Sequence, residues 1–413
     1  MDSADTLAKP PKASVGAPSR KKIDIIYNLT LVCQWDCAVC CVDAVHVRKK
    51  NGHAILRSEG LTKETKVPLK EGDSDVYEAA YRFRASQGLE LTLEKKRQVI
   101  DNLSAYDARV DISGGDALLL RDNFEMLRYA SHKLGRDNVS LTATGAGSSR
   151  YSATELAPLI DEYNFTFDAE SITDVANRPS GYALGNLKKA EAFARLGAKT
   201  RAELPLTKSI MSEDHLARVY KLLHEKGIGK LLLMRLFPVG RGGGVSSEIP
   251  TPADYQRAIA TMRRLEAVYK TPVLKLQCAL KHLANVQTPG NLNPCDLVHE
   301  SFGLMSDGTL LASPWAIGGV GRPLDPVWVL GNLAETRMED ILAGERAREF
   351  ARRSDENFGH CKIFSFLNGT SPRKMDRIFE KADPLYTARR PEPIQEVAGR
   401  TVRTAAELSV QLQ

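Results

Sequence analysis

Short apolar runs alternate with amphipathic stretches over the first two thirds of the chain, and this alternation limits the possible folds more than any other feature. The apolar runs predict six strands, over residues 23–32, 109–113, 139–144, 164–168, 199–204 and 230–235. The amphipathic stretches predict helices over residues 93–103, 123–133, 153–163, 187–196 and 214–226. Such alternation indicates parallel βα units, whose ligands bind at the C-terminal ends of the strands. It does not by itself distinguish a barrel from an open doubly wound sheet.

Two segments depart from this pattern. Residues 42–88 are polar and too many for an ordinary βα connection, so we expect a lid, a substrate-binding insertion or a partly disordered loop. After Gly244, a predicted helix over residues 254–269 leads into turn-rich sequence. We therefore expect a disordered tail over residues 1–22, an α/β domain over 23–244, a smaller domain over 245–370 and a C-terminal tail over 371–413.

Composition and charge argue against several classes of function. Of the 413 residues, 43% are hydrophobic and 26% are charged, which is typical of a soluble globular protein. The 57 basic residues exceed the 51 acidic ones, but they form short clusters without interleaved aromatic residues, so nucleic-acid binding is unsupported. No run of about 18 apolar residues predicts a membrane span. Residues 1–22 also lack the apolar core of a secretory signal, and we expect a cytoplasmic protein.

Four of the seven cysteines lie together, directly after the first predicted strand: Cys33, Cys37, Cys40 and Cys41. In a chain without an export signal, such clustering indicates metal or redox chemistry rather than disulfides. Three thiolates in a short loop can bind one metal centre, and soft sulfur ligands favour zinc or iron–sulfur. A zinc site would need a fourth ligand, which Cys41 or His46 could supply. The spacing favours iron–sulfur, and the alternative is a zinc-binding regulatory or interaction protein on a βα scaffold.

The second predicted strand ends in a turn that carries two glycines and an acid, Ser113-Gly114-Gly115-Asp116. Glycines let the backbone approach a ligand closely, and a carboxylate can accept hydrogen bonds from a ligand's ammonium group. Because both motifs follow the C-terminal ends of predicted strands, we expect them on the same side of the sheet.

Together, the cysteine spacing, the Gly-Gly-acid turn and the six-strand run resemble the radical S-adenosylmethionine (SAM) superfamily, over about residues 22–244. The resemblance implies a partial (β/α)6 TIM-like barrel and a [4Fe–4S] cluster bound by Cys33, Cys37 and Cys40. One iron would stay open for the amine and carboxylate of S-adenosylmethionine (AdoMet). A reductase or a flavodoxin or ferredoxin would supply the electron that cleaves AdoMet to a 5′-deoxyadenosyl radical, which abstracts a substrate hydrogen atom. In this resemblance Val39 replaces a usually aromatic residue, and Asp116 replaces a more common glutamate.

The resemblance also assigns roles to individual side chains. The cofactor-binding residues would be Ser113, Gly114, Gly115, Asp116, Thr144, Asp168, Arg201 and Arg235. The last four lie near strand ends, where each could equally belong to an interior ion pair. Cys41 adjoins the cluster loop and is our first candidate for a hydrogen-atom donor in catalysis.

The C-terminal third resembles the SPASM/twitch branch of the superfamily, in which a small α+β domain binds auxiliary iron–sulfur clusters. Segments 237–241 and 306–313 carry the resemblance, and Cys278, Gly290 and Cys295 match its cysteine spacing. With Cys361 as the only later cysteine, we expect at most one auxiliary cluster, either with an open site or completed by His360, Ser313 or a substrate group. The alternative is that these three cysteines are small apolar residues of a clusterless domain.

Members of this branch modify ribosomal peptides or small molecules, so the resemblance implies an enzyme of natural-product biosynthesis. About twenty residues precede the first predicted strand, so we expect no fused leader-binding domain. Residues 42–88 could shape a pocket for either kind of substrate. Neither motif distinguishes a peptide from a small molecule.

Overall fold

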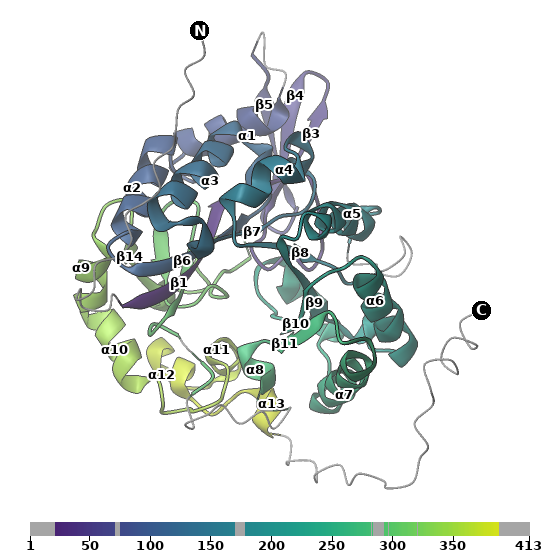
Figure 1. Ribbon diagram of the computed structural model, residues 1–413. Coiled ribbons are helices and arrows are strands. Elements are labelled where there is room, and N and C mark those ends of the chain that lie inside the picture. The colour runs from purple at the N-terminus through teal and green to yellow at the C-terminus, as the bar shows by residue number, and fades with distance from the viewer. Residues whose placement is uncertain are drawn as a thin grey trace, which may run out of the picture.

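A ten-stranded sheet forms the frame of the molecule (Figure 1). The computed structural model describes residues 21–387 except 71–74, 170–177, 282, 284–292, 296 and 320. Seven strands pair in parallel in sequence order along the sheet: β1 (Lys22–Thr30), β6 (Asp107–Gly114), β7 (Val139–Thr142), β8 (Glu162–Thr166), β9 (Lys199–Leu206), β10 (Lys230–Arg235) and β11 (Val273–Leu276). Among the described residues the sheet's edge strands do not pair with each other. The predicted α/β partial barrel is therefore confirmed, and β11 continues the parallel series beyond the six predicted strands.

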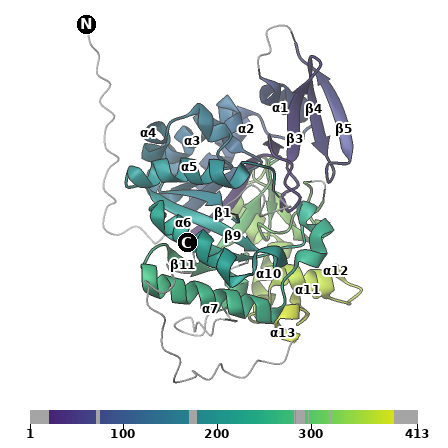
Figure 2. The same ribbon diagram turned by 90° about the vertical axis from the view of Figure 1, so that its right-hand side faces the viewer.

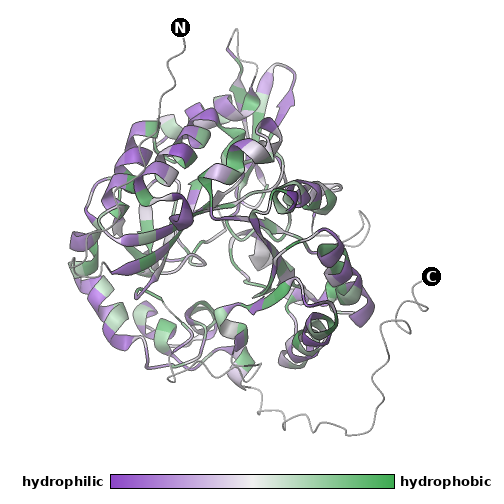
Figure 3. Ribbon diagram, in the orientation of Figure 1, coloured by the Kyte–Doolittle hydropathy of each residue, from purple (hydrophilic) through white to green (hydrophobic). Residues whose placement is uncertain are grey.

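Helices cover the outer face of this sheet (Figure 1). They are α2 (Leu93–Leu103), α3 (Arg121–Leu134), α5 (Tyr182–Arg195), α6 (Glu213–Glu225) and α7 (Pro252–Tyr269). Thr92 caps α2 and a Thr251–Asp254 capping box begins α7, which satisfies backbone N–H groups that have no partner within the helix. Figure 3 shows hydrophilic and hydrophobic residues side by side along these helices, as expected where one face packs on a sheet.

The predicted helix over residues 153–163 is wrong in its second half. Helix α4 covers only Ala153–Leu156, a 3₁₀ turn follows over Ala157–Leu159, and β8 already begins at Glu162. Pro158 has no backbone N–H to donate, so an α-helix does not continue through this position.

The described residues of the 42–88 segment, together with Val32–Cys33 just before it, form a second, smaller sheet with a helix (Figure 2). Its strands are β2 (Val32–Cys33), β3 (Val45–Lys50), β4 (His53–Ser58) and β5 (Lys63–Pro68), and helix α1 (Val76–Ser86) packs on them. The turn between β3 and β4 is Asn51-Gly52, where both residues have positive φ angles, as a tight hairpin requires. Buried Val45, Val47 and Leu56 give this unit its own apolar core, so most of the insertion is folded structure rather than a loop.

The chain after Gly244 extends the large sheet instead of building a separate one. Strand β12 (Ser301–Leu304) pairs in parallel with β1, and β13 (Thr309–Leu311) and β14 (Val329–Asn332) continue in antiparallel fashion. The Asp307-Gly308 turn joins β12 to β13, with Gly308 at a φ of 87°. Five short helices follow β14 in the described residues: α9 (Met338–Ala343), α10 (Glu345–Arg353), α11 (Lys362–Asn368), α12 (Lys374–Phe379) and α13 (Pro384–Thr387). A domain boundary near Gly244 stays a prediction.

The two ends of the chain fall partly outside the described residues, which exclude 1–20 and 388–413. Within the described part of the predicted C-terminal tail, Ile378, Asp383 and Leu385 are buried. No described helix combines the length and the apolar character needed to cross a membrane.

A buried ion pair attaches this C-terminal segment to the barrel. Two guanidinium nitrogens of Arg235, at the end of β10, donate to the two carboxylate oxygens of Asp383 at 2.7 and 2.8 Å. Asp383 also accepts hydrogen bonds from the backbone N–H groups of Cys361 and Leu385. Both charged side chains are almost fully buried, so each depends on the other for its compensating charge.

We predict that Asp383→Ala destabilises the protein by about 3–5 kcal/mol, because it leaves the Arg235 guanidinium buried without a carboxylate. Urea unfolding of the two proteins measures the difference. Glu339→Ala is the control, since it removes an exposed ion pair with Arg337 and should cost at most about 1 kcal/mol. Equal losses in the two variants would contradict this interpretation.

Candidate functional site

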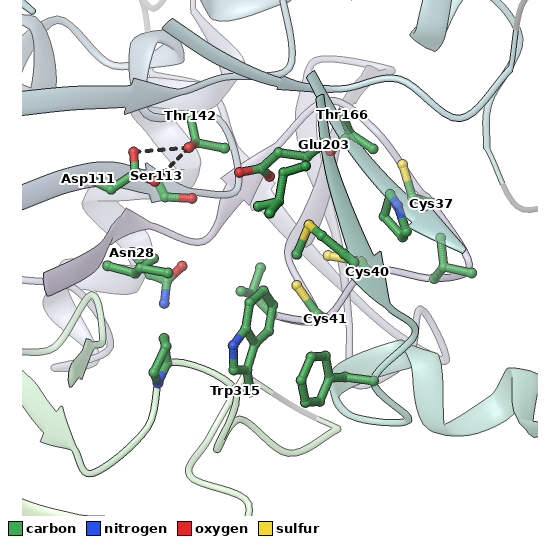
Figure 4. Close-up of a pocket in the computed structure, with 18 of the residues that line it drawn as sticks. Asn28, Cys37, Cys40, Cys41, Asp111, Ser113, Thr142, Thr166, Glu203 and Trp315 are labelled. Carbon is green, nitrogen blue, oxygen red and sulfur yellow. Dashed lines mark hydrogen bonds between the residues drawn. The ribbon is translucent and has the colours of Figure 1, made fainter. Parts of the chain in front are cut away.

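A cavity of about 410 Å³ lies at the C-terminal ends of the parallel strands (Figure 4). Its walls contain most of the residues that the sequence analysis selected: Cys33, Cys37, Cys40, Cys41, Ser113, Gly114, Gly115, Thr144, Arg201, Arg235 and Cys278. Four other selected residues do not line this cavity: Asp116, Asp168, Cys295 and Cys361. The structure therefore brings the cysteine loop and the Gly-Gly turn together, as expected for motifs that follow neighbouring parallel strands.

The cysteine loop presents three thiols to this cavity. The backbone N–H of Trp35 donates to Cys33 Sγ, and that of Ala44 donates to Cys40 Sγ, both at 3.4 Å. Burial raises the pKa of the Cys33 and Cys37 thiols, while the nearby Arg178 guanidinium opposes the rise at Cys37. Hydrogen bonds to sulfur are among the contacts that tune protein-bound iron–sulfur clusters.

Two kinds of metal centre can be compared with these thiols. Within the part of the chain that the structure describes, no three His, Cys, Asp or Glu side chains are grouped to hold a metal ion. Cys33, Cys37 and Cys40 instead line the wall of one cavity. In a four-iron cluster each thiolate binds a different iron, whereas the ligands of zinc surround a single ion. The all-sulfur donor set and its spread along a wall fit a cluster.

The Gly-Gly-Asp turn is hydrogen-bonded to the chain that enters the cysteine loop. Gly115 N–H donates to the Thr30 carbonyl at 2.7 Å, and Asp116 N–H donates to the Val32 carbonyl at 2.9 Å. A Cβ atom at Gly114 would collide with the Thr30 carbonyl, and one at Gly115 with the Val32 carbonyl. The glycines are therefore required by the approach of the protein's own backbone, in addition to any ligand contact.

The Asp116 carboxylate lies behind the cavity wall. It accepts hydrogen bonds from Gly147 N–H at 2.7 Å, Thr144 Oγ1 at 2.5 Å and Leu118 N–H at 3.2 Å, and burial raises its pKa. Thr144, which does line the cavity, also accepts from the indole N–H of Trp35 at 3.1 Å. In this arrangement Asp116 orients a wall residue, and its contact with a cofactor ammonium stays a prediction.

Three of the four predicted strand-end contacts, Asp168, Arg201 and Arg235, belong to interior ion pairs, the alternative that the sequence left open. Arg235 pairs with Asp383, as described above, and Asp168 accepts from Arg178 Nε at 2.7 Å. Arg178 lines the cavity next to Cys37 and lies over the Tyr182 ring. No sequence signal identified Arg178, because only the tertiary structure brings it to the cysteine loop.

Arg201 lies in a group of acidic side chains inside the barrel. It contacts Glu162 and Glu203 at 3.2 Å each, and Asp111 at 4.0 Å. Burial raises the pKa of Asp111 and of Glu203, and both line the cavity. Neither residue was predicted from the sequence, although an acid flanked by apolar residues, as Asp111 is in β6 and Glu203 is in β9, was a usable signal.

Arg241 fastens the cysteine loop from the opposite side. Its Nε donates to the Cys37 carbonyl at 2.8 Å, and one terminal nitrogen donates to the Ala44 carbonyl at 2.6 Å and to Asp43 Oδ1 at 3.0 Å. Its backbone N–H donates to the Cys40 carbonyl at 2.9 Å. The Asp43–Arg241 pair is buried, so the segment that follows β10 holds the loop in one conformation.

Cys41 also lines the cavity, and Figure 4 shows it beside Cys40. Burial, with a smaller contribution from Cys40, raises its pKa to about 12. The side chain is therefore a neutral thiol near pH 7, which retains the S–H hydrogen that a donor role needs. That role stays a prediction.

The three C-terminal cysteines lie at or near the end of the cavity. Cys278 lines it from α8 (Cys278–Lys281), whereas Cys295 and Cys361 do not. Burial raises the pKa of Cys361 to about 12, and Cys295 is close enough to contribute to the rise. Gly290, the middle residue of the predicted auxiliary motif, lies outside the described residues. An auxiliary cluster stays a prediction.

His360 and Ser313 are the two residues that the sequence predicts as further ligands of an auxiliary cluster. The His360 ring packs against Tyr386, with 4.4 Å between ring centroids. Ser313 is buried, and its hydroxyl accepts from Trp315 N–H at 3.3 Å. Neither contact assigns the residue to a metal.

Comparison with known proteins identifies the fold. No protein-family model matches the sequence, and no curated protein matches it. Streptococcus suis SuiB bound to its precursor peptide SuiA matches with a TM-score of 0.56 and 12% identity, over 81% of this chain and 67% of SuiB. The anSMEcpe structure with bound AdoMet matches with a TM-score of 0.56 and 14% identity, over 88% of this chain and 93% of anSMEcpe. Both are radical SAM enzymes, and the chain has their fold.

We predict that Arg241→Ala weakens iron retention after anaerobic reconstitution by roughly 10-fold or more, because hydrogen bonds that hold metal ligands in place typically contribute that much to metal affinity. The variant loses the hydrogen bonds to the Cys37 and Ala44 carbonyls and leaves Asp43 buried without its cation. Iron remaining after a chelator challenge is the measurement.

Arg257→Ala is the matched control, since this arginine is exposed on α7 and its removal should leave iron retention unchanged. Arg241→Lys should fall between the two, because lysine keeps the charge but not the forked geometry. Wild-type iron retention in folded Arg241→Ala would show that the loop does not depend on this residue.

Proposed function

We propose that this chain is a radical SAM enzyme, in which Cys33, Cys37 and Cys40 bind a [4Fe–4S] cluster and the cavity beside them binds AdoMet. The observation that carries the proposal is the convergence of these three thiols and the Gly114-Gly115 turn on one cavity of about 410 Å³. A cavity of that size suits a ligand as large as AdoMet. When bound, the cluster and AdoMet would supply a 5′-deoxyadenosyl radical that abstracts a substrate hydrogen atom.

The protein's own residues would orient the ligands and keep water out. Thr144, held by Asp116 and Trp35, presents a fixed hydroxyl beside the Gly-Gly turn. On another wall, Phe237 and Trp315 stack in parallel, with 4.7 Å between ring centroids. Both rings line the cavity and give it a dry, apolar surface, which suits a reactive intermediate that water or side reactions would consume.

The Arg178–Asp168 pair would act on the electrostatics of the cluster site. Its guanidinium lies close enough to Cys37 to oppose the rise in the pKa of that thiol. A neighbouring cation favours the thiolate over the thiol, and the thiolate is the form that binds iron. We infer that Arg178 helps Cys37 to act as a ligand in a buried site.

We further propose a role in natural-product biosynthesis in the cytoplasm, with a reductase, flavodoxin or ferredoxin as electron donor. The substrate is a peptide or a small molecule. SuiB is bound to the precursor peptide SuiA, and a further anSMEcpe structure, with a TM-score of 0.54 and 13% identity over 88% of this chain and 97% of that one, holds AdoMet and the Cp18Cys peptide. These neighbours support the peptide. Cys278, Cys295 and Cys361 would bind one auxiliary cluster.

Anaerobic reconstitution with iron and sulfide tests the proposal. We expect a brown protein that absorbs at about 400 nm, as thiolate-ligated clusters do, and that forms 5′-deoxyadenosine from AdoMet under reductant. The Cys33/Cys37/Cys40→Ala triple variant should lose AdoMet cleavage, because it lacks every proposed ligand of the first cluster.

Iron counting in the same triple variant tests the auxiliary cluster. Residual iron would support binding by Cys278, Cys295 and Cys361, and no residual iron would make these cysteines structural. One tightly bound zinc per chain in the wild-type protein, with no AdoMet cleavage, would instead support the zinc-binding regulatory or interaction protein and refute the enzyme.

A further inference from the structure

We propose that the cavity contains a subsite for a substrate ammonium group, formed by Asn28, Asp111 and Glu203. In Figure 4, Asn28 and Asp111 lie across the cavity from Cys37, and Glu203 lies between these two groups. The inference deepens the proposed function, because it names the chemistry of the group that would enter the same cavity as the cofactor. The inference rests on the proposed function only for the conclusion that the ammonium group belongs to a substrate.

Asn28 supplies the first observation. It lies on β1 with only 2% of its surface exposed, and it lines the cavity. Among the described residues, its side-chain oxygen has no hydrogen-bond partner. Figure 4 shows the amide directed into the cavity. A buried carbonyl oxygen without a donor is costly, so this atom indicates a ligand that brings a donor.

The charge balance around Arg201 supplies the second observation. Three carboxylates contact the Arg201 guanidinium: those of Asp111, Glu162 and Glu203. Two cations face them, Arg201 and Lys230, and Lys230 contacts Glu162 at 2.6 Å. Three negative charges against two positive ones leave one negative charge in the interior. Such a charge is unfavourable because the Asp111 and Glu203 side chains are each only 15% exposed, and a bound cation would compensate it.

Glu203 is the group that can reach this cation. One of its carboxylate oxygens accepts from Arg201 at 3.2 Å, and the other has no hydrogen-bond partner among the described residues. Its side chain keeps 15% of its surface exposed and lines the cavity. Burial raises its pKa and that of Asp111, as expected for acids that lack a full complement of positive charge.

The other arginines of the cavity wall do not change this balance. Each forms an ion pair with its own aspartate: Arg178 with Asp168, Arg235 with Asp383 and Arg241 with Asp43. Lys281, on α8, also lines the cavity and would attract an anion instead. An anionic ligand is therefore the competing outcome that the experiment must include.

The remaining chemistry selects an ammonium group. The carboxylates and the free amide oxygen are all acceptors, and a primary ammonium brings three donors and one positive charge. The stacked Phe237 and Trp315 rings add an aromatic wall, a surface that attracts cations and the carbon skeletons that carry them. A lysine side chain of a peptide and an amino sugar or aminocyclitol share this chemistry.

Binding to the reconstituted full-length protein tests the proposal with matched probes. The first pair is Nα-acetyl-lysine N-methylamide and its neutral norleucine counterpart, and the second is glucosamine and glucose. Nα-acetyl-glutamate N-methylamide is the anionic probe. Ligand-observed NMR gives the Kd of each. We expect one cationic probe to bind at least about tenfold more tightly than its neutral match, and the pair that shows this difference identifies the source of the ammonium.

Variants locate the subsite. Glu203→Gln and Asn28→Leu should each reduce the cationic preference about tenfold or abolish it, whereas Asn28→Asp, which adds a carboxylate, should strengthen it. The control Glu335→Gln makes the same change at an exposed position and should have no effect. Unchanged unfolding midpoints show that each variant is folded, and Asn28→Asp provides a gain that misfolding cannot mimic.

Several results would overturn the inference. They are equal binding of cationic and neutral probes, no binding of any cationic probe, preference for the anionic probe, or a preference that survives both Glu203→Gln and Asn28→Leu. Glu203→Gln could also lower the affinity for AdoMet in the absence of any probe. That result would mean that this wall binds the cofactor, and it too would overturn the inference. Failure of the wild-type protein to cleave AdoMet would refute the proposed function, while the binding data would still report on the subsite.

Discussion

The candidate site depends on two backbone hydrogen bonds between the Gly114-Gly115-Asp116 turn and the chain that leads into the cysteine loop. They place the end of β6 against the end of β1 so closely that no side chain fits at either glycine. Arg241 then binds the loop from the side of β10. Because the loop is held at both sides, its three thiols have fixed positions on one cavity wall before any ligand arrives, which is the preorganisation that a cofactor site requires.

Three buried ion pairs also hold the wall of the cavity in place. Asp43–Arg241, Asp168–Arg178 and Arg235–Asp383 each join an arginine of the cavity wall to an aspartate behind it. Each pair is costly to bury but more costly to break, so together they fix the wall rather than merely stabilise the fold. The three aspartates also neutralise the positive charges of the three arginines in the cavity wall. Around Arg201, in contrast, the carboxylates outnumber the cations that pair with them. For this reason we place the proposed ammonium subsite there.

Much of the fold could be predicted from the sequence, because apolar periodicity and cysteine spacing are local signals. The strand over residues 230–235 and the helix over 93–103 agree with β10 and α2 to the residue. The small sheet was missed since two of its strands, β3 and β5, are rich in charged residues, although Asn51-Gly52 marks its hairpin. The partners of Arg235 and Arg241 could not be predicted, because Asp383 is 148 residues and Asp43 is 198 residues away in the chain.

The central claim is that Cys33, Cys37 and Cys40 bind a cluster with an iron that AdoMet can reach. Electron paramagnetic resonance of the reduced, reconstituted protein, recorded with and without AdoMet, tests it most directly. We expect the signal of a reduced [4Fe–4S] cluster whose g values change when AdoMet is added, because the ligand would bind the cluster itself. A cluster signal that AdoMet leaves unchanged, or a reduced protein with no cluster signal, would contradict it.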